Sequence, residues 1–236
     1  MIKNLAIRAP FFEIGPKAYL YGDDLIALAI AADEASEKYG VDVIFTTPYL
    51  SISQVKAATS RIHIFAPHMD PIRPGRGLTA ILPEGVKAAG AEGVMLNHCE
   101  HPLTLGVLNS TIRRAEEAGL ATIACGDSLS EASALAVLGP DIIVAEPSEL
   151  VGTGISVGPE YVQAATDAVK KYNPSILVLT AAGISNGNDV YNTIAAGADA
   201  TGTSSGIAKL PTREARAAMV DEMISAVRRA WDERHS

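Results

Sequence analysis

The chain contains 236 residues, of which 48% are hydrophobic, and it carries a formal net charge of −8. A nucleic-acid-binding protein usually presents a basic face, and no cluster of lysine and arginine supplies one here, so nucleic acid is not expected as a partner. The N-terminal apolar run is too short for a signal peptide or a membrane span, and Cys99 and Cys125 are expected to be free thiols of a cytoplasmic protein.

Eight short apolar runs rich in β-branched residues predict strands. In chain order they cover residues 10–14, 41–45, 62–66, 93–97, 122–125, 142–145, 176–180 and 198–202. Longer amphipathic runs between them predict helices. The first runs from a cap at Asp23 or Asp24 to residue 39, a short one covers 51–59, and others cover 83–90, 105–118 and 159–172. Another runs from a cap at Ser128 or Ser130 to 138. Of the last two, one follows Gly187 or Asn188 and ends near 197, and the other begins at Pro211 or Thr212 and ends at 231.

Eight strand–helix units without a break in composition predict a closed (β/α)8 barrel of the α/β class. We expect one domain over residues 1–236, with residues 1–9 as an extension before the first barrel strand. A doubly wound open sheet is the alternative. It is weakened because no Gly-x-Gly-x-x-Gly turn follows the first strand.

Active sites of such barrels lie at the carboxyl ends of the strands. Glu146 follows the sixth strand, His98 follows the fourth and Lys17 follows the first, so these three side chains are expected to meet there. Pro147 stiffens the exit from the sixth strand, and residues 148–154 are expected to form a lid that excludes water. Glu149 is a rival acid, but it lies within the lid rather than at the strand end.

Two loops after the seventh and eighth strands predict a phosphate site. They read AAGIS (residues 181–185) and GTSSGI (residues 202–207), and both are rich in glycine and hydroxyl side chains. Backbone N–H groups exposed in such loops, with a helix start behind them, bind anions. The alternative is that the glycines only permit tight turns.

A metal site at residues 98–101 is a further alternative. His98, Cys99, Glu100 and His101 are all possible ligands. Neighbouring strand residues point to opposite faces, however, so the four cannot converge from a strand. No metal is therefore expected at these residues.

Four motifs in this order resemble the triosephosphate isomerase family, in its short, archaeal-like branch. AEPSELVGTG (residues 145–154) resembles the segment with the catalytic glutamate and lid, and LNHCEHP (residues 96–102) resembles the segment with the catalytic histidine. AAGIS and GTSSGI resemble the two phosphate loops, and residues 66–90 are similar to the third loop. The resemblance covers nearly the whole chain from about Phe11 and implies a TIM barrel.

The resemblance also implies roles for individual residues. Glu146 would be the base that moves a proton between two substrate carbons, His98 would polarise the carbonyl, and Lys17 would attract the phosphate and stabilise the enediolate. Glu100 would be an acid beside the lysine. The residues implied in holding the phosphate are Gly154, Gly183, Ser185, Ser204, Ser205 and Gly206.

The expected activity is that of an aldose–ketose isomerase that interconverts glyceraldehyde 3-phosphate and dihydroxyacetone phosphate in glycolysis and gluconeogenesis, as a homodimer or homotetramer without cofactor. One departure keeps alternatives open: the family's Asn-x-Lys motif is Gly15-Pro16-Lys17 here. The loss of one oxyanion donor can slow a reaction by about 10²–10³-fold. A four-carbon ketose phosphate is therefore the alternative substrate, and a non-catalytic barrel that binds sugar phosphates is the alternative class.

Overall fold

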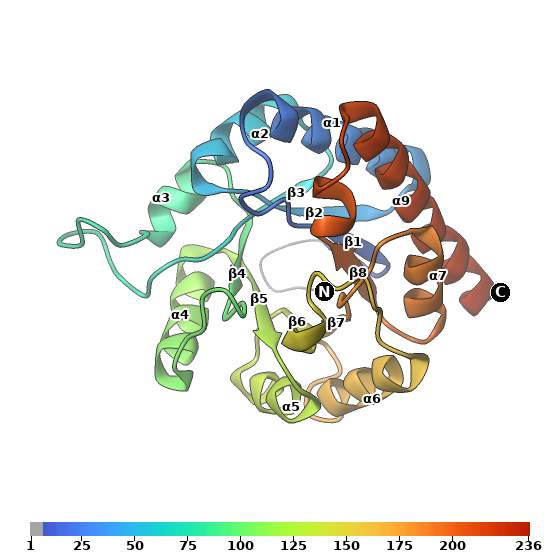
Figure 1. Cartoon of the computed structure of the whole chain (residues 1–236). Helices are drawn as coiled ribbons and strands as arrows, with labels where there is room; N and C mark the ends of the chain where they lie inside the picture. The colour runs from blue at the N-terminus through green and yellow to red at the C-terminus, as the bar shows by residue number, and fades with distance from the viewer. Residues whose placement is uncertain (1–6) are drawn as a thin grey trace.

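The computed structural model describes residues 7–236, and its strands form a closed parallel barrel in the order β1 to β8 (Figure 1). The strands are β1 (Phe11–Ile14), β2 (Asp42–Thr46), β3 (His63–Ala66), β4 (Gly93–Leu96), β5 (Ala121–Gly126), β6 (Ile142–Ala145), β7 (Leu177–Leu179) and β8 (Ala200–Thr203). The barrel closes because β1 pairs in parallel with both β2 and β8. The predicted (β/α)8 barrel is confirmed, and the open sheet is excluded.

The helices form a ring around the barrel, as Figure 1 shows. They are α1 (Gly22–Tyr39), α2 (Ile52–Ala58), α3 (Pro83–Ala88), α4 (Leu105–Ala118), α5 (Leu129–Leu138), α6 (Pro159–Lys170), α7 (Gly187–Ala195), α8 (Ser205–Ala208) and α9 (Arg213–His235). Single 3-10 turns precede α2 (Tyr49–Ser51) and follow β6 (Ser148–Leu150). Each predicted helix is present, with ends shifted by a few residues.

Two details of the helix prediction are wrong. Neither Asp23 nor Asp24 caps α1, because the helix begins at Gly22 and its cap position is Tyr21, which makes no side-chain cap hydrogen bond. The four-residue helix α8 was not predicted, because a single turn is too short to show a helical period. The single-domain division stays a prediction, and residues 1–6 of the expected extension lie outside the described residues.

The strands carry two apolar layers, since neighbouring side chains point to opposite faces. Phe12 and Ile14 of β1 pack in the layer between barrel and helices. Phe11 belongs instead to the smaller cluster inside the barrel, which also contains Ile44, Phe65 and Ile142. Alternation along β1 therefore directs its next odd-numbered residue, position 13, toward the barrel axis.

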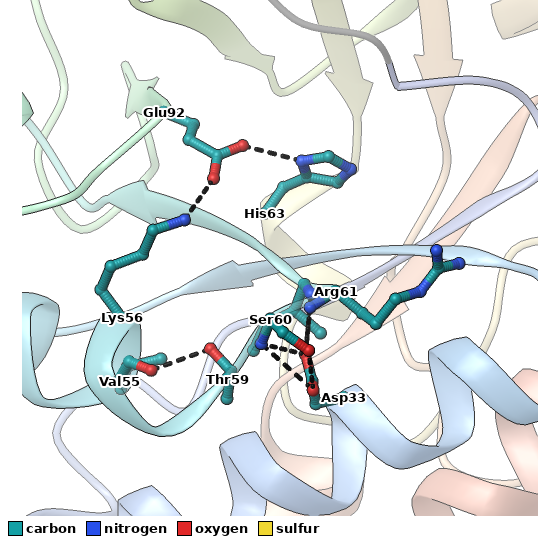
Figure 2. A network of polar contacts seen from close by, with 9 residues as sticks. Asp33, Val55, Lys56, Thr59, Ser60, Arg61, His63 and Glu92 are labelled. Carbon is teal, nitrogen blue, oxygen red and sulfur yellow. Dashed lines mark hydrogen bonds and ion pairs between the residues drawn. The ribbon is translucent and has the colours of Figure 1, made fainter.

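Polar side chains form a network around the start of β3, at the amino-terminal end of the barrel, as Figure 2 shows. The Asp33 carboxylate accepts hydrogen bonds from the backbone N–H groups of Ser60, Arg61 and Ile62, at 3.0, 2.6 and 3.0 Å. Glu92 pairs with Lys56 at 3.0 Å and with His63 at 2.8 Å. These contacts tie the start of β3 to α1, α2 and the start of β4, away from the end where the predicted site lies.

Candidate active site

One cavity of about 1270 Å³ lies at the carboxyl ends of the strands, and every predicted site residue lines it. Lys17 comes from the loop after β1, His98 from the loop after β4 and Glu146 from the residue after β6. These positions are far apart in the sequence, and closure of the barrel brings them to a single pocket.

Lys17 is held by strained backbone and by an ion pair. Its φ angle of 49° is unusual for a residue other than glycine, and such a conformation persists only where surrounding structure enforces it. The Nζ atom lies 2.8 Å from Oε1 of Glu100. Burial lowers the pKa of Lys17, but the hydrogen bond and charge of Glu100 outweigh it and leave the pKa raised. Lys17 is therefore a fixed cation at the pocket.

His98 is held as a neutral imidazole. Burial lowers its pKa, and the nearby charge of Lys17 lowers it further. The backbone N–H of Glu100 donates a hydrogen bond to Nδ1 at 3.1 Å, so Nδ1 is the acceptor nitrogen. In the neutral ring the proton then resides on Nε2. His98 can therefore donate a hydrogen bond from Nε2 without carrying a charge.

Of the two acids that the sequence analysis considered as the base, Glu146 is half-buried and Glu149 is exposed. Burial raises the pKa of Glu146, the charge of Asp127 adds to this effect, and Lys17 opposes it. A carboxylate with a raised pKa is a stronger base. The segment after it is anchored at one point, where Ser148 donates from its backbone N–H and, at 3.0 Å, from its hydroxyl to Asp127.

The backbone just beyond the lid segment lies against the loop after β7. A Cβ atom added at Gly183 would lie 1.9 Å from the carbonyl oxygen of Ile155, so only glycine permits this approach. Gly152 and Gly154 both have φ angles of 76°, which glycine adopts readily. Residues 151–154 line the pocket, so the lid segment forms part of its wall.

The two predicted phosphate loops face the same cavity. Ser185 is oriented by Asp189, which accepts from its backbone N–H at 3.0 Å and from its hydroxyl at 2.9 Å. Ser204, Ser205 and Gly206 lie at the start of α8, and the buried Ser204 hydroxyl has no hydrogen-bond partner among the described residues. Backbone N–H groups at the start of α8 are suited to an anion.

Residues 98–101 lie in a turn beyond β4, where the His101 N–H donates to the His98 carbonyl at 2.7 Å. The strand argument against a metal site therefore used the wrong element. Over residues 7–236, no group of three or more His, Cys, Asp and Glu side chains is placed to hold a metal ion. Cys99 and Cys125 are free, as predicted. No helix in this part of the chain is long and apolar enough to cross a membrane.

The sequence matches the family model described as triosephosphate isomerase over residues 17–223. The chain belongs to the triosephosphate isomerase family. The triosephosphate isomerase of Saccharolobus solfataricus is 34% identical over 227 residues, covering 94% of this chain and 98% of that protein. The triosephosphate isomerase of Methanosarcina barkeri is 36% identical over 205 residues, covering 85% of this chain and 92% of that protein.

One pocket residue escaped the sequence analysis. Glu13 of β1 lines the cavity together with the three predicted catalytic side chains, and its side chain is buried. It lies before Lys17, where the match to the triosephosphate isomerase model begins. The sequence did contain an indication of it. Glu13 is the single acid in the apolar run FFEI, and it lies two residues from the inward-facing Phe11, on the same face of the strand.

Proposed function

We propose that the chain interconverts glyceraldehyde 3-phosphate and dihydroxyacetone phosphate, the reaction named for its relatives. The observation that carries the proposal is the meeting of Glu146, His98 and Lys17 in one pocket of a triosephosphate isomerase-family barrel. An acid–base pair beside a fixed cation suits proton transfer between adjacent carbons. The family match favours this reaction over a four-carbon substrate and over a non-catalytic barrel.

The three side chains divide the chemistry. Glu146 removes a proton from the carbon next to the carbonyl and returns it to the neighbouring carbon. His98 donates from Nε2 to the substrate oxygens, and Lys17 offsets the negative charge of the enediolate. A proton donated to a substrate oxygen must later return to the imidazole, and this suits a neutral donor. The lowered pKa of His98 keeps its imidazole neutral.

The phosphate of the substrate is expected to bind the loops after β7 and β8. Gly183, Ser185, Ser204, Ser205 and Gly206 line the cavity. The N–H and hydroxyl of Ser185 are already bonded to Asp189, so the backbone N–H groups of Ser205 and Gly206 at the start of α8 are the donors expected to meet the phosphate. Gly154 belongs to the lid segment, which would cover the bound phosphate and keep water from the enediolate. Glu100 acts through Lys17, which it holds at 2.8 Å.

The direct test is turnover by the purified protein, with glyceraldehyde 3-phosphate and erythrulose phosphates compared side by side. We expect the triose to turn over with kcat/KM of about 10⁶ M⁻¹s⁻¹ or more. A protein that is slow on the triose and fast on the tetrose would move the assignment to the four-carbon substrate. Binding of sugar phosphates without turnover of either would establish a non-catalytic barrel.

We also propose a homodimer or homotetramer in the cytoplasm. The loop between β3 and α3 projects beyond the ring of helices in Figure 1, and Leu78 in this loop is 103% exposed. A single exposed apolar side chain is common on monomers, so the proposal rests on the family resemblance, and Leu78 marks the loop that a second copy would cover. Light scattering of the wild type and of Leu78→Ser tests this proposal. A wild-type mass of one chain would contradict it.

A further inference from the structure

Glu13 lies in the middle of the active-site end of the barrel. Its position on β1 points toward the barrel axis, and the side chain lines the cavity that Lys17, His98 and Glu146 share. Glu13 is only 7% exposed, so its carboxyl is removed from bulk water and faces the pocket. A buried acid in this place requires a reason, because burial of a charge is costly.

Two glycines leave room for the Glu13 carboxyl. A Cβ atom at Gly15 would lie 3.1 Å from Oε1 of Glu13. A Cβ atom at Gly202, the partner of Glu13 on β8, would lie 2.8 Å from Cβ and 3.1 Å from Oε2 of Glu13. Gly15 is the position where the family resemblance implies an asparagine. The Glu13 carboxyl therefore occupies the space into which a side chain at position 15 would extend.

The hydrogen bonds of Glu13 leave one oxygen available. Oε1 accepts from the Thr46 hydroxyl on β2 at 2.6 Å. No hydrogen bond to Oε2 is present among residues 7–236. If Oε2 carries a proton, it is a hydrogen-bond donor placed in the pocket wall.

The surroundings favour the protonated form. Burial raises the pKa of Glu13 to about 7, the Thr46 hydrogen bond and the charge of Lys17 oppose this rise, and the Glu146 charge adds to it. The other titratable group that faces it is the buried Cys125 thiol of β5, whose pKa is raised by burial and by both glutamates. The residues beside it on the adjacent strands are Thr46 of β2 and Gly202 of β8, and neither side chain titrates.

We propose that Glu13 is a further catalytic residue, whose protonated carboxyl donates a hydrogen bond from Oε2 to the substrate oxygen that becomes negative in the enediolate. It does the work that the resemblance assigns to an asparagine amide at position 15. Glu13 keeps its proton throughout, while the carbon-bound proton moves to Glu146 and back. The inference rests on the proposed isomerase function.

Two variants of Glu13 test the proposal, with the isomerisation rate measured on the substrate that the wild type turns over. Glu13→Gln retains a donor and is expected to keep kcat/KM within about tenfold of wild type at pH 6. Glu13→Leu lacks a donor and is expected to lose about 10²–10³-fold. Thermal unfolding and the affinity for inorganic phosphate show whether each variant is folded with an intact phosphate site.

A double variant tests the shared space. Gly15→Asn alone is expected to lose activity, because its Cβ atom would meet Oε1 of Glu13 at 3.1 Å. Glu13→Ala/Gly15→Asn is expected to be at least tenfold faster than Glu13→Ala, because the amide then has room and supplies the donor. A double variant no faster than Glu13→Ala would contradict the shared position.

The dependence of kcat/KM on pH distinguishes a catalytic Glu13 from a purely structural one, because a structural role would leave it unchanged. In the wild type, kcat/KM is expected to fall above about pH 7 as Glu13 loses its proton. Glu13→Gln cannot lose a proton, so this decline is expected to move to higher pH. An unchanged decline in Glu13→Gln would overturn the proposal, and so would a folded Glu13→Leu variant with wild-type activity. A wild type that turns over no sugar phosphate would instead refute the proposed function itself.

Discussion

The two ends of the barrel use the same residue types in opposite ways. At the amino-terminal end, burial raises the pKa of Glu92, but hydrogen bonds from His63 and Lys56 outweigh burial and leave the pKa lowered. At the carboxyl end, burial raises the pKa of Glu13 and Glu146, and no comparable set of donors reverses this effect. Glu92 is therefore held as a charged structural group, whereas the pKa values of Glu13 and Glu146 are raised. Glu100 at the carboxyl end resembles Glu92, since its ion pair with Lys17 lowers its pKa.

The backbone explains part of this difference. Acids stand at or just before the start of each even-numbered strand, where they can bond to the preceding strand. Asp42 accepts from Arg8 N–H, Asp141 from Thr122 N–H and Asp199 from Val178 N–H, each at 2.9 Å, and Glu92 pairs with His63. Backbone donors at the strand starts therefore bond Asp42, Asp141 and Asp199, and side chains bond Glu92. Within the described part of the chain, Glu13 and Glu146 at the carboxyl end have no backbone donor of this kind.

Removal of the Glu146 carboxylate should produce the largest effect. Glu146→Gln is expected to lower kcat at least 10³-fold, because proton transfer from carbon then lacks its base, with KM changed by only a few-fold. Glu149→Gln is the matched control on the same segment and should remain within about twofold of wild type. Steady-state kinetics measure both. Equal losses in the two variants would break the assignment.

The next largest effect expected at the carboxyl end is a dependence of the unfolding free energy on pH. The folded protein keeps the Glu13 proton up to a pH of about 7, whereas an ordinary glutamate releases it near 4.5. The folded state therefore binds more protons in this window, and its stability falls as the pH rises through it. Relative to Glu13→Gln, the wild type should lose about 3 kcal/mol of unfolding free energy between pH 4.5 and pH 8. Urea unfolding at several pH values measures this loss, and parallel curves would contradict it.

At the amino-terminal end, removal of an acid should affect stability and leave the rate unchanged. Asp33→Ala leaves three backbone N–H groups without their acceptor and is expected to reduce the unfolding free energy by about 2 kcal/mol. Glu34→Ala, the exposed neighbour on α1, should cost no more than about 0.5 kcal/mol. Chemical unfolding and kcat are measured together. A reduced kcat in Asp33→Ala would show that the two ends are coupled.

The ion pair between Lys56 and Glu92 should contribute least. Its Lys56 side chain is 48% exposed, and exposed pairs typically contribute less than about 1 kcal/mol. Lys56→Met is therefore expected to shift stability by about 0.5 kcal/mol, because His63 still holds Glu92 at 2.8 Å. Thermal unfolding tests this, and a cost as large as that of Asp33→Ala would show that Lys56 is essential to the network.

The sequence predicted those parts of the molecule that depend on local pattern. Strand and helix positions follow from apolar runs and their period, and Lys17, His98 and Glu146 stand out because each comes just after a predicted strand. Glu13 was missed for a physical reason. A barrel strand is apolar on both faces, so its sequence does not show which face points inward. The space for its carboxyl also depends on Gly202, almost 190 residues away along the chain.

Local sequence pattern also could not predict which loops contact one another. The sequence left open whether the glycine in residues 181–185 only permits a tight turn, yet Gly183 is required because the backbone of Ile155, just beyond the lid segment, lies against it. The predicted cap of α1 was wrong for a similar reason. Asp24 pairs with Arg213 at the start of α9, and sequence spacing could not reveal this partner.

The contact at Gly183 sets a limit on how this region can vary among natural or laboratory sequences. Any Cβ atom there would sit 1.9 Å from the Ile155 carbonyl, and its φ angle of 71° disfavours other residues as well. A codon library at position 183 should therefore return glycine almost exclusively among active clones. The same library at Gly106 of α4, where a Cβ atom meets nothing within 4 Å, should return nearly every residue except proline.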